Sequence, residues 1–378
     1  MKNKNTYLVI TPFFPSDDSF VGSYIFDQIN HIRIQSGFNI EVVKVTSIFS
    51  LEQDYHFKEF KVRIFKTIDF PYFILPGIFN WINKFRFRYF LKRKAIEDIK
   101  VSHSHVTYPC SYLVEGLDCK KITQHHGLDV LQLLNGRNRL IREIQRNFLI
   151  RNSIKHINSA NLNVGVSALV LEQLRDYKGY VPVHEYVLYN GVDTSKFFDT
   201  RRDKKNNVFT IGCVANFVKS KGQQTLIRSV QEILESGRMI RLRFIGSGPT
   251  LDSCQEYVLT NNLSTHISFE SEIAHEELNN FYNSLDLFVL PSYYEALGCV
   301  YLEAWAANTP FIGVRGQGIS ELVTHQENML FEANNIEDLK GKICYFMDNN
   351  YTLASVGDLD IKKTISQFLS LELFRNHD

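Results

Sequence analysis

The 378-residue chain is too long for one ordinary core, so two domains are the expected organisation. Its 44% hydrophobic and 22% charged residues are typical of a globular protein and exclude a disordered chain. The formal net charge of +1 gives no overall attraction to nucleic acid, and the sequence contains no recognised nucleic-acid-binding module.

The cysteines and the apolar segments indicate the cellular compartment of the protein. The six cysteines are scattered, with no C-x-x-C pair and no histidines at zinc spacing. This pattern argues against a disulfide framework or a structural metal and fits a reducing compartment. No apolar stretch approaches the roughly 18 residues of a membrane span. We therefore expect a cytoplasmic protein that does not cross a bilayer.

The first half of the chain alternates strand and helix. Residues 7–11 are an apolar run that ends at Pro12, three isoleucines then recur at helical spacing up to Gly37, and residues 40–45 return to strand. This β-loop-α-β order predicts a right-handed crossover and parallel strands. Further strands are expected at residues 121–124, 162–166 and 184–189.

The same alternation begins again after a polar linker. Residues 190–193 form a turn signal, and residues 199–207 are almost wholly polar. Strands are then expected at residues 209–214, 242–245, 287–289 and 311–314, with an amphipathic helix at residues 222–236. These two series predict an α/β fold of two Rossmann-like doubly wound domains facing a cleft. The expected domains are residues 1–195 on the acceptor side, residues 196–360 on the donor side, and a C-terminal helix within residues 361–378 that packs back on the first domain.

The densest chemical signal is the stretch of residues 290–304. Glu295 and Glu303 lie eight positions apart, which on one helix would separate them by roughly 80°. Gly298 between them instead predicts that Glu295 lies in a strand-to-helix loop and Glu303 inside the helix. Such carboxylates can accept hydrogen bonds from two sugar rings, although an unrelated loop acid and helix acid are the alternative.

This stretch, with Pro291-Ser292 before it and Asn308-Thr309-Pro310 after it, resembles the E-x7-E signature of glycosyltransferase family 4, a retaining family with the GT-B fold. The resemblance covers residues 190–331 well and the first half loosely. It continues at Asn190-Gly191-Val192-Asp193, Gly246-Ser247-Gly248, Gly318-Ile319-Ser320-Glu321 and His126-Gly127. It implies a nucleotide-sugar site in which Glu303 holds the ribose. The implied donor-binding residues also include Gly246, Gly248, Glu295, Ala296, Leu297 and Gly298.

A second candidate loop, residues 216–222, follows a strand and opens a helix. A helix N-terminus with a nearby lysine suits a diphosphate, although solvated surface lysines are the alternative. The resemblance implies that Lys221 binds the donor phosphate. The family usually has an arginine where this chain has Asn216, so either Lys219 compensates as a donor-binding residue or donor affinity is reduced.

Two features of the first half match the family more loosely. The resemblance implies that His126 reaches the donor sugar near the reacting carbon, whereas a lone histidine is otherwise a structural residue. Asp129 is a weaker match. Gly22 stands where family members tend to have a glycine pair that approaches the phosphates, and an ordinary loop is the alternative.

The segment from Trp81 to Lys94 is basic and aromatic, with no acidic residue. As a helix it is a candidate surface for an anionic membrane. A solvated basic face over an aromatic core stripe is the alternative.

Together these features imply a retaining glycosyltransferase that moves a sugar from a nucleoside diphosphate sugar, expected to be UDP-linked, to an acceptor hydroxyl. The expected catalytic residues are His126, Lys221 and Glu295, with no metal and no cofactor. The expected acceptor is a lipid-linked glycan of bacterial surface polysaccharide, which would place the protein peripherally at the inner face of the cell membrane. An epimerase or phosphorylase of the same fold, and a non-catalytic partner subunit for which Asn216 argues, remain open alternatives.

Overall fold

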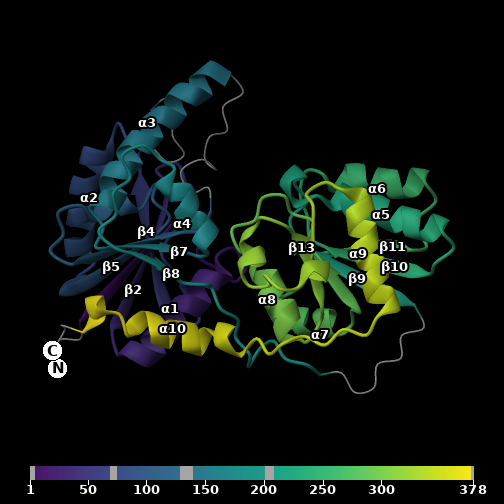
Figure 1. Cartoon of the computed structure of the whole chain (residues 1–378). Helices are drawn as coiled ribbons and strands as arrows, with labels where there is room; N and C mark the ends of the chain where they lie inside the picture. The colour runs from purple at the N-terminus through teal and green to yellow at the C-terminus, as the bar shows by residue number, and fades with distance from the viewer. Residues whose placement is uncertain (1–4, 69–74, 128–138, 201–207, 376–378) are drawn as a thin grey trace. The chain divides into compact units, whose positions relative to one another are not determined.

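The computed structural model describes residues 5–68, 75–127, 139–200 and 208–375, with only the backbone of residues 139–142. The chain divides into two compact units (Figure 1): an N-terminal unit, Met1–Asn190 with Lys362–Asp378, and a C-terminal unit, Gly191–Ile361. The sequence assigns residues 191–195 to the first domain, whereas the structure places them in the C-terminal unit. The reason is backbone pairing, because the Val192 amide donates to the Leu359 carbonyl at 2.8 Å and the Ile361 amide donates to the Val192 carbonyl at 3.0 Å.

The described strands of the N-terminal unit form one sheet in the order β3-β4-β2-β1-β5-β6-β7-β8. These strands are β1 (Thr6–Thr11), β2 (Asn39–Ser47), β3 (Tyr55–Phe57), β4 (Phe60–Thr67), β5 (Ile99–His105), β6 (Lys120–His125), β7 (Leu162–Gly165) and β8 (Glu185–Val187). The helices are α1 (Ser23–Ser36), α2 (Asn80–Arg93), η1 (Ser111–Val114), α3 (Arg139–Asn158) and α4 (Ala168–Arg175). The predicted parallel pairing of β1 with β2 is confirmed, and the described pairing that runs antiparallel is the β3–β4 hairpin.

The sequence did not predict β3, β4 or β5. The strand β5 lies between β1 and β6, and its second half alternates serine and histidine. A polar strand of this kind resembles a loop in sequence, yet its residues from Val101 to His105 are all buried. As a consequence, His103 and His105 lie on one face of a central strand.

The described strands of the C-terminal unit form a parallel sheet in the order β11-β10-β9-β12-β13-β14. These strands are β9 (Phe209–Val214), β10 (Ile240–Ile245), β11 (Ile267–Glu270), β12 (Leu287–Val289), β13 (Phe311–Val314) and β14 (Leu330–Phe331). The helices are η2 (Lys219–Lys221), α5 (Gln223–Glu235), α6 (Leu251–Thr260), η3 (His275–Glu277), α7 (Leu278–Asn283), α8 (Cys299–Ala306), η4 (Gly318–Glu321), η5 (Glu327–Met329), α9 (Ile336–Asp348) and η6 (Gly357–Leu359). After β9 the chain adds β10 and β11 on one side of it. The chain then returns to the other side of β9 with β12 and continues outward with β13 and β14. The direction in which strands are added therefore reverses between β9 and β12. This reversal is the switch point at which doubly wound sheets bind ligands.

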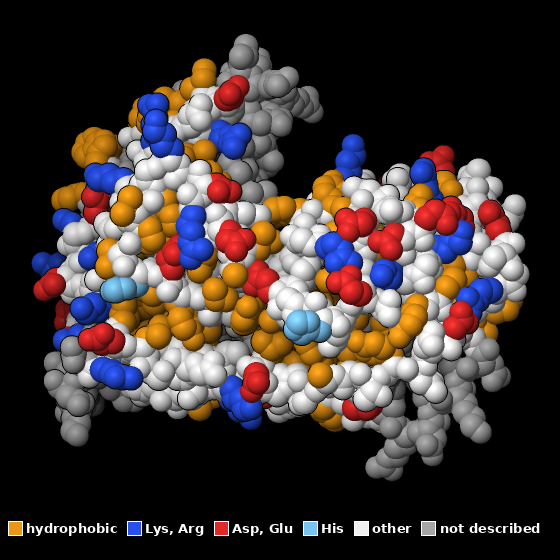
Figure 2. Space-filling model, viewed as in Figure 1, with side chains coloured by type: hydrophobic (Ala, Val, Ile, Leu, Met, Phe, Trp, Pro, Cys, Tyr) orange, Lys and Arg blue, Asp and Glu red, His pale blue; other side chains and the backbone are white. Residues whose placement is uncertain are grey.

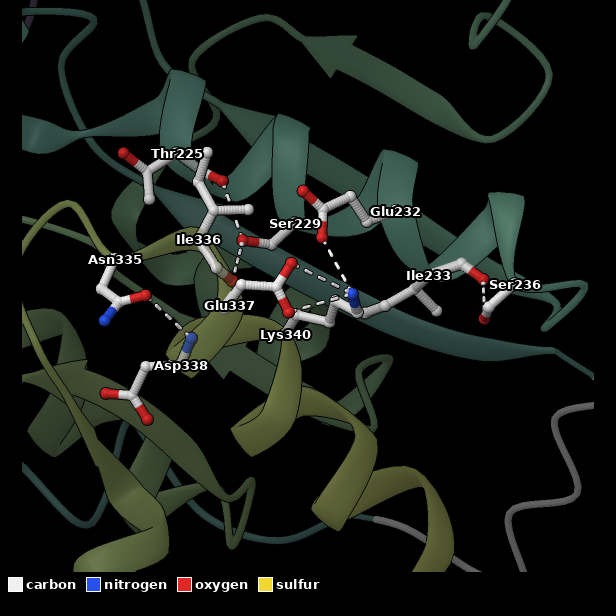
Figure 3. Close-up of polar contacts among 10 residues, drawn as sticks. All are labelled: Thr225, Ser229, Glu232, Ile233, Ser236, Asn335, Ile336, Glu337, Asp338 and Lys340. Carbon is white, nitrogen blue, oxygen red and sulfur yellow. Dashed lines mark hydrogen bonds and ion pairs between the residues drawn. The ribbon is translucent and has the colours of Figure 1, made fainter.

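Helix α5 follows the first strand of this sheet and packs against α6 and α9 (Figure 1). Of its predicted apolar face, Leu226, Val230 and Ile233 are buried, while Leu234 is half-buried. Figure 3 shows a polar seam between α5 and α9, where the Ser229 hydroxyl donates to the Ile336 carbonyl at 3.1 Å and Lys340 pairs with Glu232 at 2.9 Å. The Asn335 side chain caps the start of α9. These contacts join α9 to α5.

Helix α10 (Ile361–Leu369), followed by η7 (Glu372–Phe374), packs on the N-terminal unit. The buried Phe368 ring lies 6.1 Å from the ring of His103 and 6.0 Å from that of Tyr186. Within the described ranges, no helix has both the length and the apolar character that a membrane crossing requires.

Candidate active site

The loops after β9 and β12 touch each other. Gly222, at the end of η2, has φ 67°, and a side-chain carbon there would lie 2.3 Å from the Pro291 carbonyl oxygen. Glycine is therefore required both by the backbone conformation and by this close approach. The Tyr293 amide also donates to the Ser220 carbonyl at 3.0 Å. Two segments distant in sequence are thus held side by side.

This contact joins the two residues on which the predicted site depends. Lys221 Nζ lies 2.5 Å from Glu295 Oε2, with the side chains 24% and 14% exposed respectively. Because β9 and β12 are adjacent parallel strands, both loops leave the same edge of the sheet. The structure therefore places a partly buried ion pair at the switch point.

The loop of Glu295 is also tied to the segment after β13. The Glu295 amide donates to Gln317 Oε1 at 2.8 Å, and the Gly318 amide donates to the Glu295 carbonyl at 3.1 Å. Ala296, Leu297 and Gly298 form the turn from Glu295 into α8, with Gly298 at φ 82°. Glu295 thus lies in the loop and Glu303 lies inside α8, as the intervening glycine predicted.

Glu303 is held from a neighbouring segment of the chain. Its carboxylate accepts a hydrogen bond from the Tyr282 hydroxyl at 2.7 Å, and its other oxygen lies 3.1 Å from His275 Nε2. Glu303 is only 8% exposed, so these donors compensate the burial of its charge. The thiol of Cys213, the residue before the last of β9, is buried nearby. Burial raises the pKa of Cys213 to about 12, against the opposing charge of Lys221.

The remaining predicted donor-binding residues of the C-terminal unit lie in the loops after β9 and β10. Gly246 and Gly248 flank Ser247, whose carbonyl accepts from the Phe217 amide at 2.7 Å, so these two loops are in contact. Asn216 and Lys219 are both exposed, and the Asn216 carbonyl accepts from the Gln223 side chain at 2.9 Å. Lys219 is therefore available to a ligand.

In the N-terminal unit, His126 directly follows β6. Its Nε2 lies 3.1 Å from Nδ1 of His105, the two rings stack at 5.3 Å, and the Tyr24 ring lies 5.0 Å away. Burial, reinforced by His103 and His125, lowers the pKa of His126 to about 3. His126 is therefore a neutral imidazole at neutral pH. Gly22 stands at the N-terminus of α1, after β1, and Asp129 lies outside the described residues.

Three further histidines of this unit, His103, His105 and His125, are fully buried. His103 stacks on His105 at 4.2 Å and its Nδ1 lies 2.7 Å from the Tyr7 hydroxyl, while His125 lies between Thr107 and Asn163. Burial lowers the pKa of His103 to about 3 and that of His125 to about 4, and it holds the pKa of His105 well below its ordinary value.

Sequence reasoning missed residues that contact the predicted ones, among them His105, His275, Tyr282 and Gln317. The alternation Ser102-His103-Ser104-His105 carried a signal, since it puts both histidines on one face of a strand. The other three carried none, because their partners are fixed only by the packing of distant segments.

No group of three or more His, Cys, Asp and Glu side chains within the described part of the chain could hold a metal ion. That the protein needs no metal stays a prediction.

Comparisons with known proteins agree with this fold. The sequence model described as Glycosyltransferase Family 4 matches residues 22–196, and that described as Glycosyl transferases group 1 matches residues 194–366. Among solved structures, a glycosyltransferase from Rickettsia africae superposes with a TM-score of 0.70 at 16% identity, covering 99% of this chain and 100% of that one. Anabaena HepE in complex with UDP gives a TM-score of 0.69 at 14% identity, covering 96% and 98%. At these identities the likeness shows the fold alone.

Curated relatives are more similar but are matched over shorter segments. A GDP-mannose-dependent phosphatidylinositol monomannoside mannosyltransferase of Corynebacterium glutamicum is 25% identical over 51% of this chain and 54% of its own length. The lipopolysaccharide core mannosyltransferase LpsB of Rhizobium meliloti is 24% identical over 67% of this chain and 76% of its own length. The capsular polysaccharide glycosyltransferase CapM of Staphylococcus aureus is 28% identical over 47% of each. The chain thus spans about half the length of two of these three relatives.

The two doubly wound units have the GT-B fold and match, in succession, the two sequence models of glycosyltransferases. The chain belongs to glycosyltransferase family 4.

Proposed function

We propose that this chain transfers a sugar from a nucleoside diphosphate sugar to an acceptor hydroxyl with retention at the anomeric carbon. The observation that carries the proposal is the Lys221–Glu295 ion pair, which lies at the switch point between β9 and β12. An ammonium group has three N–H donors, so Lys221 can bind Glu295 and a phosphate oxygen at the same time.

Each group then has a role. Lys221 and the N-terminus of α5 stabilise the departing diphosphate. Glu295 and the turn of residues 296–298 hold the sugar hydroxyls, while Glu303 holds the ribose. His126, as a neutral imidazole, hydrogen-bonds the sugar beside the reacting carbon. The bond from the anomeric carbon to the phosphate oxygen breaks, the bond to the acceptor oxygen forms on the same face, and the acceptor proton passes to the departing phosphate.

This scheme uses no metal. We therefore predict that a chelator leaves the turnover number of the enzyme unchanged.

The donor class is tested by binding and transfer with a panel of UDP and GDP sugars. We expect a UDP sugar, and GDP-mannose is included because one relative above is named for it. The expected result is thermal stabilisation by one donor and its consumption only when acceptor is present. Consumption without acceptor would instead identify an epimerase. A chain that binds none of these nucleotides would be a non-catalytic subunit.

For the acceptor we propose a lipid-linked glycan of a bacterial surface polysaccharide. The names of the three relatives support this class, since they act in lipopolysaccharide core, capsule and phosphatidylinositol mannoside synthesis. A lipid-linked acceptor requires the enzyme to reach a membrane.

Helix α2 supplies a surface for such docking. Trp81, Phe85 and Tyr89, one turn apart on one face, are 70%, 75% and 65% exposed, while Phe87 and Phe90 point into the core. The lysines and arginines of α2 lie among these aromatic side chains, and Figure 2 shows hydrophobic and basic groups interspersed over α2. We propose that this face docks on an anionic bilayer at the inner side of the cell membrane.

We predict that changing Trp81, Phe85 and Tyr89 together to serine lowers binding to phosphatidylglycerol vesicles at least tenfold, because the apolar area that enters the interface is lost. Sedimentation with vesicles measures this binding, and phosphatidylcholine vesicles test the charge requirement. The control is Met239→Ser with Leu259→Ser, which removes two exposed apolar side chains of the C-terminal unit. Equal binding by the triple variant and the wild type would exclude α2 as the docking surface.

A further inference from the structure

Glu303 is held by two donors that come from one short segment. Its Oε2 accepts from the Tyr282 hydroxyl at 2.7 Å and its Oε1 lies 3.1 Å from His275 Nε2. A carboxylate only accepts hydrogen bonds, so His275 contributes an N–H through Nε2. Each carboxylate oxygen keeps a second lone-pair direction for a further donor.

Tyr282 is a rigid donor. Its ring is fully buried and lies edge-on to Phe288, with centroids 5.5 Å apart. Its backbone carbonyl also accepts from the Thr309 hydroxyl at 2.8 Å. Burial, reinforced by the charge of Glu303, raises the pKa of Tyr282 well above its ordinary value, so the hydroxyl stays protonated and can only donate to the carboxylate.

His275 is the more accessible donor of the two. It begins η3, and its ring lies edge-on to Phe197 at 5.2 Å, which fixes the plane of the imidazole. The segment from His275 to Tyr282 therefore approaches Glu303 from two directions and leaves the carboxylate a single orientation.

We propose that Tyr282 and His275 are positioning residues that orient the Glu303 carboxylate to accept hydrogen bonds from the two ribose hydroxyls of the donor nucleotide. This inference rests on the proposed function and adds two residues to it. Neither residue touches the transferred sugar, so their loss should weaken nucleotide binding and leave the chemical step at saturating donor largely unchanged.

The test measures dissociation constants of UDP and GDP by calorimetry, each beside its 2′,3′-dideoxy analogue. We expect Tyr282→Phe and His275→Leu each to weaken binding of the ribonucleotide roughly tenfold and binding of the dideoxy analogue by less than about twofold. His275→Gln, which retains an N–H donor, should recover most of the loss. The turnover number at saturating donor should fall by less than about twofold while KM rises.

The matched control is Tyr257→Phe, which removes a hydroxyl that donates to Gln231 at 2.8 Å on the outer helices of the same unit. Its affinities should equal those of the wild type. If Tyr282→Phe does not fold, the His275→Leu and His275→Gln pair decides the question.

The outcomes separate the two proposals. Absence of UDP and GDP binding by the wild type would overturn the proposed function. If the wild type binds and the positioning variants lose equal affinity for ribose and dideoxyribose nucleotides, or lose none, the positioning role is wrong and the proposed function stands.

Discussion

Replacing Lys221 by alanine is expected to lower the turnover number by about two to three orders of magnitude. The departing diphosphate gains negative charge as its bond to the sugar breaks, and removing one preorganised donor to such a charge costs an enzyme about 10²- to 10³-fold. Lys221 is preorganised because η2 and the contact of Gly222 with Pro291 fix its backbone while Glu295 fixes its ammonium group. Steady-state kinetics with saturating donor measures the loss.

A matched control for this experiment is Lys340→Ala. It removes a lysine of the same unit that also has a glutamate partner, Glu232 at 2.9 Å, but on the seam between α5 and α9 (Figure 3). Turnover of this variant should equal that of the wild type. Glu295→Gln should also reduce turnover strongly, because it removes the charge that holds Lys221. Wild-type turnover by a folded Lys221→Ala variant would refute the catalytic assignment of this loop.

Acidification is expected to destabilise the N-terminal unit from about pH 6.5 downward through its buried histidines. In the unfolded chain a histidine titrates near 6.5, whereas burial lowers the pKa of His103 to about 3 and that of His125 to about 4, with that of His105 also well lowered. Below about pH 6.5 these histidines therefore bind protons in the unfolded state but not in the folded state. Each such histidine removes on the order of 1 kcal/mol of stability per pH unit until the pH reaches its folded pKa, and this loss is absent above about pH 7.5.

Urea unfolding between pH 7.5 and pH 5 measures this linkage. His105→Asn should lower stability at every pH and should also flatten its decline with pH by about one proton. The slope is the decisive readout, because the carboxylates of both proteins contribute equally to it. His56→Asn, which removes an exposed histidine of the same unit, should leave the slope as in the wild type. An unchanged slope in the His105 variant would show that this histidine takes up protons in the folded state.

Much of the C-terminal unit followed from the sequence. The strands Phe209–Val214, Leu287–Val289 and Phe311–Val314 were predicted at their observed bounds, because central parallel strands are buried on both faces and form short apolar runs. The placement of Glu295 in a loop and of Glu303 in a helix also followed, because Gly298 marks a helix start. Local composition was sufficient to predict an element wherever its apolar residues are the buried ones.

The sequence misled where a polar residue is buried. The strand β5 was missed because Ser102, His103, Ser104 and His105 suggest a loop. The strand is nevertheless buried, and it pairs with β1 along one edge and with β6 along the other. The C-terminal unit likewise begins at Gly191, because the backbone of Val192 pairs with residues 359–361 rather than with its neighbours in sequence. Backbone partners this distant along the chain leave no pattern in the local sequence.

By itself the sequence determined the alternation of strands and helices, the doubly wound class and the residues whose side chains can bind or react. Only the tertiary structure decided which of them meet. Lys221 and Glu295 are 74 residues apart, and they touch because β9 and β12 are neighbours in the sheet. His105 reaches His126 because β5 and β6 are neighbours, and Tyr282 reaches Glu303 because α7 packs against α8. The order of parallel strands is set by crossover connections and by the burial of whole sheets, which are non-local properties that no window of sequence contains.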